Sequence, residues 1–216
     1  KDGKNNRSRS FRRIVFDELC ANFLTLSENR KRIRVKKFPK IFTNKYSEQI
    51  KKKLPFNLTN NQEKVLNEIN QDLLSDKRMF RIIQGDVGSG KTIVSLLSIL
   101  NVIKSGYQCA LMSPTEILAK QHYTLVKKIF KNENFDIEFL TGKTEYKLRN
   151  VILANLKSGK IKLLVGTHAL FQKKINFQKL GLAVIDEQHK FGVKQRSDLA
   201  KKGGNECDVL LMSATP

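Results

Sequence analysis

The chain has 216 residues, of which 40% are hydrophobic, so it can bury the core of one ordinary domain and carry an appendage. It lacks the run of about eighteen apolar residues that a membrane-spanning helix requires, and its first residues are too polar for a signal peptide. The net charge of +21 points to a polyanionic partner, most simply nucleic acid, although a generally lysine-rich surface would give the same excess.

The three cysteines, Cys20, Cys109 and Cys207, lie far apart and include no C-x-x-C pair. This pattern argues against a zinc site or a disulfide framework and favours reduced thiols in a cytoplasm. The chain also begins without Met and stops directly after Ser-Ala-Thr-Pro, so we expect it to be a piece of a longer protein.

Residues 1–54 carry more than half of the excess charge, with seventeen Lys or Arg against five Asp or Glu. Between Phe11 and Leu26 the apolar residues fall largely at helical spacing, and a basic stretch follows that ends at Lys37. This pattern predicts a basic amphipathic helix over residues 11–37, within a linker segment that covers residues 1–54. The basic side either contacts nucleic-acid phosphates or another domain, or it is only a solvated helix end.

A second region, residues 55–216, begins after the boundary at Lys51-Lys52-Lys53-Leu54-Pro55. Thr59 is a good N-cap for a helix, whose apolar face would comprise Val65, Leu66, Ile69, Leu73 and Leu74. Further on, the pattern predicts strands at residues 79–83, 108–113, 135–140, 161–165, 182–185 and 208–212, separated by helices at 93–100, 115–130, 145–156 and 188–200. Such alternation predicts an α/β fold with a parallel sheet, helices on both faces, and functional groups at the carboxyl ends of the strands.

The most informative stretch is Gln84-Gly85-Asp86-Val87-Gly88-Ser89-Gly90-Lys91-Thr92, which fits the pattern G-x-x-x-x-G-K-[ST]. It lies between a predicted strand and a predicted helix, where backbone N–H groups and the helix dipole favour an anion. Lys91 can reach the outer phosphates of a nucleotide, and the Thr92 hydroxyl can ligate Mg²⁺. We therefore expect a nucleotide phosphate site at residues 85–92, against the alternative of a glycine-rich turn without function.

A second polar group follows the apolar strand predicted at residues 182–185, which ends in Asp186 and Glu187. In a parallel sheet these acids would lie at the same edge as the phosphate-binding stretch. Asp186 could then hold Mg²⁺ and Glu187 could polarise an attacking water. The alternative is that the two acids only cap a following helix.

At this point the sequence resembles a known family. The tetrad Asp186-Glu187-Gln188-His189 resembles motif II of superfamily 2 helicases and translocases. Their motifs Ia, Ib and III are similar to Pro114-Thr115-Glu116-Ile117-Leu118-Ala119, Gly166-Thr167-His168-Ala169-Leu170 and Ser213-Ala214-Thr215-Pro216. Phe56, Thr59 and Gln62 resemble the Q motif, which reads adenine.

The resemblance implies a RecA-like lobe that binds ATP, and it assigns roles residue by residue. The nucleotide would be bound by Phe56, Gln62, Gly85, Asp86, Val87, Gly88, Ser89, Gly90, Lys91 and Thr92. Thr92 and Asp186 would hold Mg²⁺, and Glu187 would be the catalytic base, assisted by Asp186 and Lys91. His189 would bond toward Ser213 or Thr215 and so couple the nucleotide state to the DNA face, while Thr115 and Thr167 would contact the nucleic-acid backbone.

Three longer runs, residues 84–92, 115–122 and 186–196, closely resemble the RecG family of bacterial ATP-dependent DNA helicases. This resemblance covers roughly residues 54–216 and implies branched double-stranded DNA as the partner, including stalled replication forks and Holliday junctions, in DNA repair and recombination. It also implies a monomeric intact protein in the bacterial cytoplasm, at the nucleoid. A second lobe would supply an arginine finger, which is worth about 10³–10⁵ in rate, so we expect the isolated chain to bind nucleotide weakly and to hydrolyse it hardly at all.

Other functions explain the sequence less fully. The transcription-repair coupling translocase shares Phe191-Gly192-Val193 but usually has Asp-Glu-Glu-Gln in place of the tetrad. An RNA-acting Asp-Glu-x-His ATPase would respond to RNA rather than duplex DNA. A small-molecule kinase would leave the motif Ia, Ib and III resemblances unexplained, and a non-enzymatic binding module would have no use for Glu187 beside Asp186.

Overall fold

The computed structural model describes residues 36–43, 45–172, 174–187 and 204–214, together with Arg13 and Phe16. Contacts divide the chain into two compact units, Lys1–Val35 and Lys36–Pro216. In the first unit Arg13 and Phe16 are helical and exposed, while most of the basic helix predicted at residues 11–37 lies outside the described residues, as does the helix predicted at 188–200. The domain limits predicted at residues 54 and 55 stay a prediction.

Helices and strands alternate along the second unit. After α2 (Lys45–Lys51) and α3 (Asn60–Leu74), the order is β1 (Phe80–Gln84), α4 (Lys91–Lys104), β2 (Gln108–Met112), α5 (Glu116–Ile129), β3 (Asp136–Leu140), α6 (Tyr146–Lys157), β4 (Ile161–Gly166), η1 (His168–Phe171), β5 (Leu180–Ile185), η3 (Gly204–Glu206) and β6 (Asp208–Ser213). The described strands form one sheet in the order β1-β6-β5-β2-β4-β3, and every pairing between them is parallel. The predicted parallel α/β fold is therefore confirmed.

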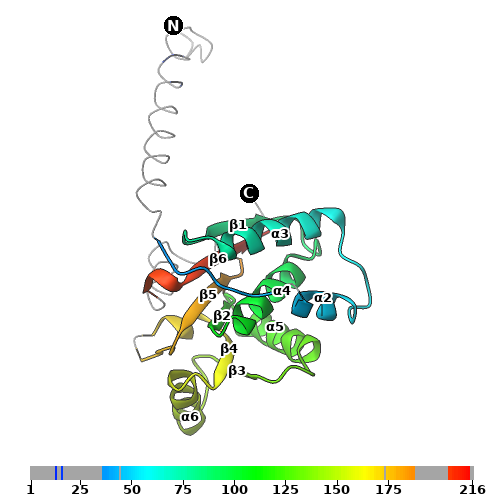
Figure 1. Ribbon diagram of the computed structural model, residues 1–216. Coiled ribbons are helices and arrows are strands. Elements are labelled where there is room, and N and C mark those ends of the chain that lie inside the picture. The colour runs from blue at the N-terminus through cyan, green and yellow to red at the C-terminus, as the bar shows by residue number, and fades with distance from the viewer. Residues whose placement is uncertain are drawn as a thin grey trace, which may run out of the picture. The chain divides into compact units, whose positions relative to one another are not determined.

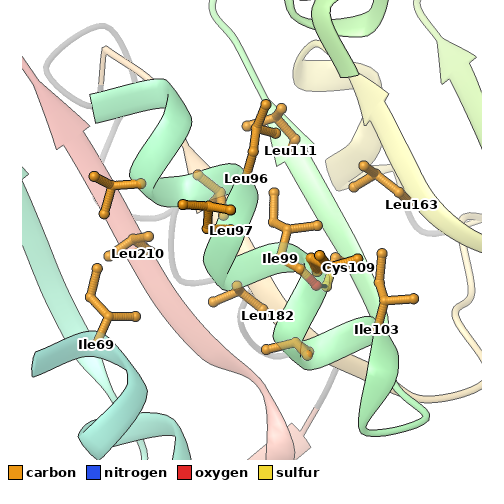
Figure 2. Packing of buried hydrophobic residues seen from close by; sticks show 14 of the residues in the cluster. Ile69, Leu96, Leu97, Ile99, Ile103, Cys109, Leu111, Leu163, Leu182 and Leu210 are labelled. Carbon is orange, nitrogen blue, oxygen red and sulfur yellow. Dashed lines mark hydrogen bonds between the residues drawn. The ribbon is translucent and has the colours of Figure 1, made fainter. Parts of the chain in front are cut away.

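Helices cover both faces of the sheet (Figure 1). On one face α2, α3, α4 and α5 pack into a core with one set of strand side chains, and on the other α6 and η1 pack against the alternate set. α4 is buried from Val94 to Ile103 without interruption, which explains why this stretch is largely apolar and carries no charged residue. Figure 2 shows Ile99 of this helix beside Cys109 of β2 and Leu182 of β5. None of the helices in the described part of the chain is long and apolar enough to cross a membrane.

The N-terminus of α3 confirms the predicted cap. The Thr59 hydroxyl accepts a hydrogen bond from Gln62 N (3.3 Å), and Gln62 Oε1 accepts one from Thr59 N (2.9 Å), which completes a capping box. Leu66 is buried on the predicted apolar face, but Leu74 is 45% exposed, so its assignment to that face was wrong. Leu74 is the last helical residue and lies one step around the helix from Leu73, beyond the buried stripe.

Residues 36–43, here called the strap, lie against the start of β6 and the connection from α3 to β1. Lys37 N donates to Asp76 O (2.8 Å), and Lys40 N donates to Leu73 O (3.0 Å). Lys37, which the sequence placed at the end of a basic helix, is outside any helix here. Pro39 follows two residues later and disfavours helical backbone before it. The strap thus belongs to the second unit and carries two lysines into its interior.

Candidate functional site

Segments far apart in the sequence meet where the parallel strands end, here called the carboxyl edge. Gly85 N, after β1, donates to Ser213 O at the end of β6 (3.3 Å), and Asp186 N, after β5, donates to Met112 O at the end of β2 (2.8 Å). Because β6 lies between β1 and β5, these contacts place the glycine-rich loop, the two acids and Ser213 along one edge. The prediction that the loop and the acids share an edge is confirmed.

The phosphate loop (residues 85–92) leads from β1 into the first turn of α4. Gly88 and Gly90 have φ angles of 82° and 84°, a left-handed conformation that strongly favours glycine. Gly90 is the N-cap of α4 and offers no side chain to the first N–H groups of the helix, whose first turn also lacks an acidic residue. Lys91 Nζ donates to Gly85 O (2.5 Å) and Asp86 O (2.7 Å). The loop therefore gathers backbone donors and an ammonium group, which suits an anion.

Gln62 connects α3 to the phosphate loop. Its Nε2 donates to Ser89 O (2.9 Å), while its Oε1 takes part in the capping box. A Cβ atom at position 90 would lie 2.3 Å from Gln62 Nε2, so this contact needs glycine for space as well as for backbone conformation. Phe56 is 48% exposed and its ring is open to a partner. The adenine contacts of Gln62 and Phe56 stay predictions.

Asp186 and Glu187 form the turn that follows β5. Glu187 has a φ of 49° and is the one non-glycine residue with positive φ in the described part of the chain. Such a conformation costs on the order of 1–3 kcal/mol and is concentrated at functional sites. Glu187 N donates to Asp186 Oδ1 (3.0 Å), and His122 Nε2 lies 2.7 Å from Asp186 Oδ2. The Asp186 carboxylate is thus contacted on both oxygens.

The sequence predicted no role for His122, although this residue is the last of the run 115–122 that resembles RecG. It lies on α5 seven residues after the N-cap Thr115, on the same side as the buried Ala119 and Val126. That spacing predicts a histidine facing the sheet, but no local pattern shows that Asp186 is its partner. The structure supplies this contact by placing α5 beside the end of β5.

The two threonines predicted to contact nucleic acid have different surroundings. Thr115 is exposed, and its hydroxyl caps α5 by accepting a hydrogen bond from Leu118 N (3.3 Å). Thr167 follows β4 and is buried, and its hydroxyl has no hydrogen-bond partner among the described residues, as is also true of Ser113 after β2. Ser113 N donates to Gly166 O (3.0 Å), so these two hydroxyl residues sit on adjacent strand ends. Their nucleic-acid contacts stay predictions.

Of the predicted coupling residues, Ser213 lies in the described part of the chain. Ser213 is buried at the end of β6, and its carbonyl oxygen accepts the bond from Gly85 N. This contact ties motif III to the start of the phosphate loop through the backbone. His189 and Thr215 lie outside the described residues, so the predicted bond from His189 stays a prediction.

Comparisons with known proteins give a consistent result. The family model of the DEAD/DEAH box helicases matches residues 59–216. The ATP-dependent DNA helicase RecG of Synechocystis sp. is 48% identical over 207 residues, which cover 95% of this chain and 25% of that protein. RecG of Aquifex aeolicus is 46% identical over 207 residues, covering 95% of this chain and 26% of that protein. The chain therefore spans about a quarter of the length of these curated relatives.

A solved structure of RecG bound to a three-way DNA junction shares the fold of this chain. It matches with a TM-score of 0.79 and 40% sequence identity, over 90% of this chain and 26% of that one. The resemblance to RecG that the motifs indicated is confirmed, and so is the RecA-like form of the sheet and its helices.

Proposed function

Because the chain belongs to the DEAD/DEAH box helicase family, we propose that it is the ATP-binding motor lobe of an ATP-dependent helicase that moves along double-stranded DNA and remodels branched structures. The observation that carries the proposal is that the phosphate loop follows β1 and the two acids follow β5 at the same edge of the sheet, with only β6 between these strands. Phosphoryl transfer needs positioning and charge neutralisation more than covalent chemistry. A loop of donors and two carboxylates on one edge of the sheet suit that need.

Each group at the edge has a distinct task in this proposal. The N–H groups at the start of α4 bind and orient the phosphates of ATP, and Lys91 exchanges its carbonyl partners, Gly85 and Asp86, for phosphate oxygens. Glu187 holds the attacking water and accepts its proton. Gln62 contacts the loop at Ser89, and in this proposal it reads the adenine edge while Phe56 packs on the ring.

The donors at this edge fit Mg²⁺. Thr92, in the first turn of α4, and Asp186 offer a hydroxyl and a carboxylate, and Mg²⁺ prefers oxygen ligands and binds through one or two protein groups together with substrate phosphates. When bound, the ion neutralises the negative charge on the phosphates. The protein's part is to hold the Asp186 carboxylate in one orientation, which its two hydrogen bonds do.

Branched double-stranded DNA, such as forks and Holliday junctions, is the proposed partner. The net charge of +21 and the similarity to RecG, solved on a three-way DNA junction, support this choice. Thr115 and Thr167 are proposed to contact the backbone, and His189, Ser213 and Thr215 to couple that contact to the nucleotide. The full-length protein is proposed to act as a monomer in the bacterial cytoplasm, at the nucleoid, in DNA repair and recombination.

The test is ATP turnover by the full-length protein without nucleic acid, with linear duplex DNA, with a model fork and with single-stranded RNA. Glu187→Gln should reduce fork-stimulated turnover by about 10²–10⁴-fold, because the amide cannot accept a proton. Glu145→Gln is the matched control, since Glu145 is exposed at the start of α6 and makes no cap hydrogen bond there. It should leave turnover unchanged.

The nucleic acids separate the competing functions. Strong stimulation by the fork, lost in Glu187→Gln, supports the proposal. An equal response to linear duplex would favour the transcription-repair coupling translocase, and a response to RNA alone would favour an RNA-acting ATPase. Turnover in Glu187→Gln equal to that of the wild type would contradict the proposed catalytic base.

A further inference from the structure

We propose that His122 is a positioning residue that orients the Asp186 carboxylate and links the first turn of α5 to the nucleotide site. His122 Nε2 lies 2.7 Å from Asp186 Oδ2. An ionised carboxylate only accepts hydrogen bonds, so Nε2 carries the hydrogen in this contact. The inference rests on the proposed function, because the orientation of Asp186 matters only if this carboxylate serves the bound nucleotide.

The Asp186 carboxylate needs a fixed partner from outside its own turn. The torsion that rotates a carboxylate is broad and roughly two-fold, so rotamer preference alone does not set the plane of the group. The bond from Glu187 N to Oδ1 is local to the turn, whereas His122 comes from a helix 64 residues earlier in the chain. His122 therefore ties the carboxylate to the body of the lobe.

The surroundings of this pair strengthen the contact. The side chains of His122 and Asp186 are only 11% and 14% exposed, and Ala119 and Val126 on either side of His122 along α5 are fully buried. A hydrogen bond with little competing water is stronger than one at the surface. Removing hydrogen-bond partners of metal-binding groups typically changes metal affinity or activity about 10–100-fold.

The same helix reaches the exposed surface at the carboxyl edge. α5 starts at the Thr115 cap, and Thr115, Ile117 and Lys120 are exposed on its first turns. His122 lies seven residues after Thr115, which corresponds to about 10 Å along the helix axis. Two turns of a helix move as one body, so a nucleic-acid phosphate that displaces the first turn also moves the imidazole relative to Asp186. This gives a direct physical route from the DNA face to the metal-binding carboxylate.

The test compares the full-length wild-type protein with His122→Ala, His122→Gln and Thr124→Ala. Glutamine keeps an N–H donor of similar reach, and Thr124 is exposed on the same helix, so its variant controls for substitution in α5. Affinity for Mn²⁺ is measured by electron paramagnetic resonance with a non-hydrolysable ATP analogue, with and without forked DNA. The Mg²⁺ concentration for half-maximal ATP turnover and the thermal unfolding of each variant are measured in parallel.

We expect His122→Ala to weaken Mn²⁺ binding and raise the half-saturating Mg²⁺ concentration about 10–100-fold, while nucleotide binding without metal stays unchanged. His122→Gln should recover most of this loss, and Thr124→Ala should match the wild type. Forked DNA should tighten Mn²⁺ binding by the wild type about fivefold or more, a typical coupling between sites, and should not do so in His122→Ala.

Unchanged Mn²⁺ affinity in folded His122→Ala would overturn the positioning role, and so would an equal defect in His122→Gln. A DNA effect that survives in His122→Ala would overturn the link through α5. If His122→Ala does not fold, His122→Asn replaces it, because its amide is too short to reach Asp186. A failure of the proposed function looks different, since the wild type itself would then show no ATP turnover that depends on Glu187.

Discussion

Buried polar groups differ in their hydrogen bonding between the two edges of the sheet. At the edge where the strands begin, here called the amino edge, the buried Asp208 accepts hydrogen bonds from two lysines of the strap and from Met79 N. At the carboxyl edge the hydroxyls of Ser113 and Thr167 are buried without a partner in the described part of the chain, and Glu187 has a positive φ. Unpaired buried hydroxyls and a strained backbone lower stability, and such features are found mainly at functional sites. The amino edge therefore holds a buried, hydrogen-bonded ion pair, whereas the carboxyl edge carries features that are typical of ligand sites.

Hydrogen bonds compensate for burying charge at the amino edge. Asp208 Oδ2 lies 2.7 Å from Lys37 Nζ and 2.6 Å from Lys40 Nζ, and none of the three side chains is exposed. Lys37 Nζ also donates to Asp72 O (3.0 Å), and Lys40 Nζ donates to Glu206 O (2.8 Å). Burial lowers the pKa of Lys37, and the neighbouring Asp208 opposes this by favouring the charged form. Buried charges are tolerated when they are paired and hydrogen-bonded in this way.

The largest expected effect is at the amino edge, where Asp208→Asn removes the carboxylate that two buried lysines share. The variant keeps the shape of the side chain but leaves both ammonium groups without their anion. We expect the free energy of unfolding to fall by about 3–5 kcal/mol, measured by urea denaturation followed by circular dichroism.

Asp136→Asn is the matched control for this prediction. Asp136 is also the first residue of a strand, β3, but its side chain is half exposed and 3.9 Å from Lys160 Nζ. A surface pair of this kind contributes less than about 1 kcal/mol. Equal losses in the two variants would break the contrast between the edges, because burial at the amino edge would then have no special effect.

A smaller effect is expected at Gln62, which serves stability and the site together. Gln62→Ala removes the bond to Thr59 N and the bond to Ser89 O, so we expect a loss of about 1–2 kcal/mol in the free energy of unfolding and weaker binding of a fluorescent ATP analogue. Gln71→Ala, exposed on the same helix, should change stability by less than about 0.5 kcal/mol. If Gln62→Ala binds the nucleotide as tightly as the wild type, Gln62 contributes to stability but not to nucleotide binding.

The sequence predicted the carboxyl edge far better than the amino edge. The phosphate loop is a local pattern. Positions 88 and 90 need a backbone conformation that glycine adopts easily, and position 91 needs a long cationic side chain. Asp208, by contrast, lies 171 and 168 residues from its partners Lys37 and Lys40. Lysine is almost always exposed, so nothing local marks a lysine that will be buried.

Intermediate cases follow the same logic. The spacing along α5 predicts that His122 faces the sheet, but its contact with Asp186 depends on how the helix packs. The seven-residue α2 was missed because it is too short to show a helical period, and Leu74 was misplaced because a helix end carries no sharp apolar pattern. The phosphate loop and its place beside the acids on one edge thus follow from a local pattern and from the parallel sheet, whereas individual side-chain contacts between distant segments, such as His122 with Asp186, were not predicted.

The smallest expected effect has the opposite sign and lies at the carboxyl edge. Thr167→Val keeps the shape of the side chain and removes a buried hydroxyl for which the described segments supply no partner. We expect the free energy of unfolding to rise by about 1 kcal/mol, because an unsatisfied buried group is no longer present.

Thr141→Val is the matched control, since Thr141 is also buried but its hydroxyl accepts a bond from Lys143 N (3.3 Å). This variant should lose about 1 kcal/mol of unfolding free energy. If urea denaturation shows the same loss of unfolding free energy in both variants, the Thr167 hydroxyl contributes to stability, and the carboxyl edge does not lower the stability of the fold. A gain in stability together with reduced fork-stimulated ATP turnover would instead show that the hydroxyl is kept for function.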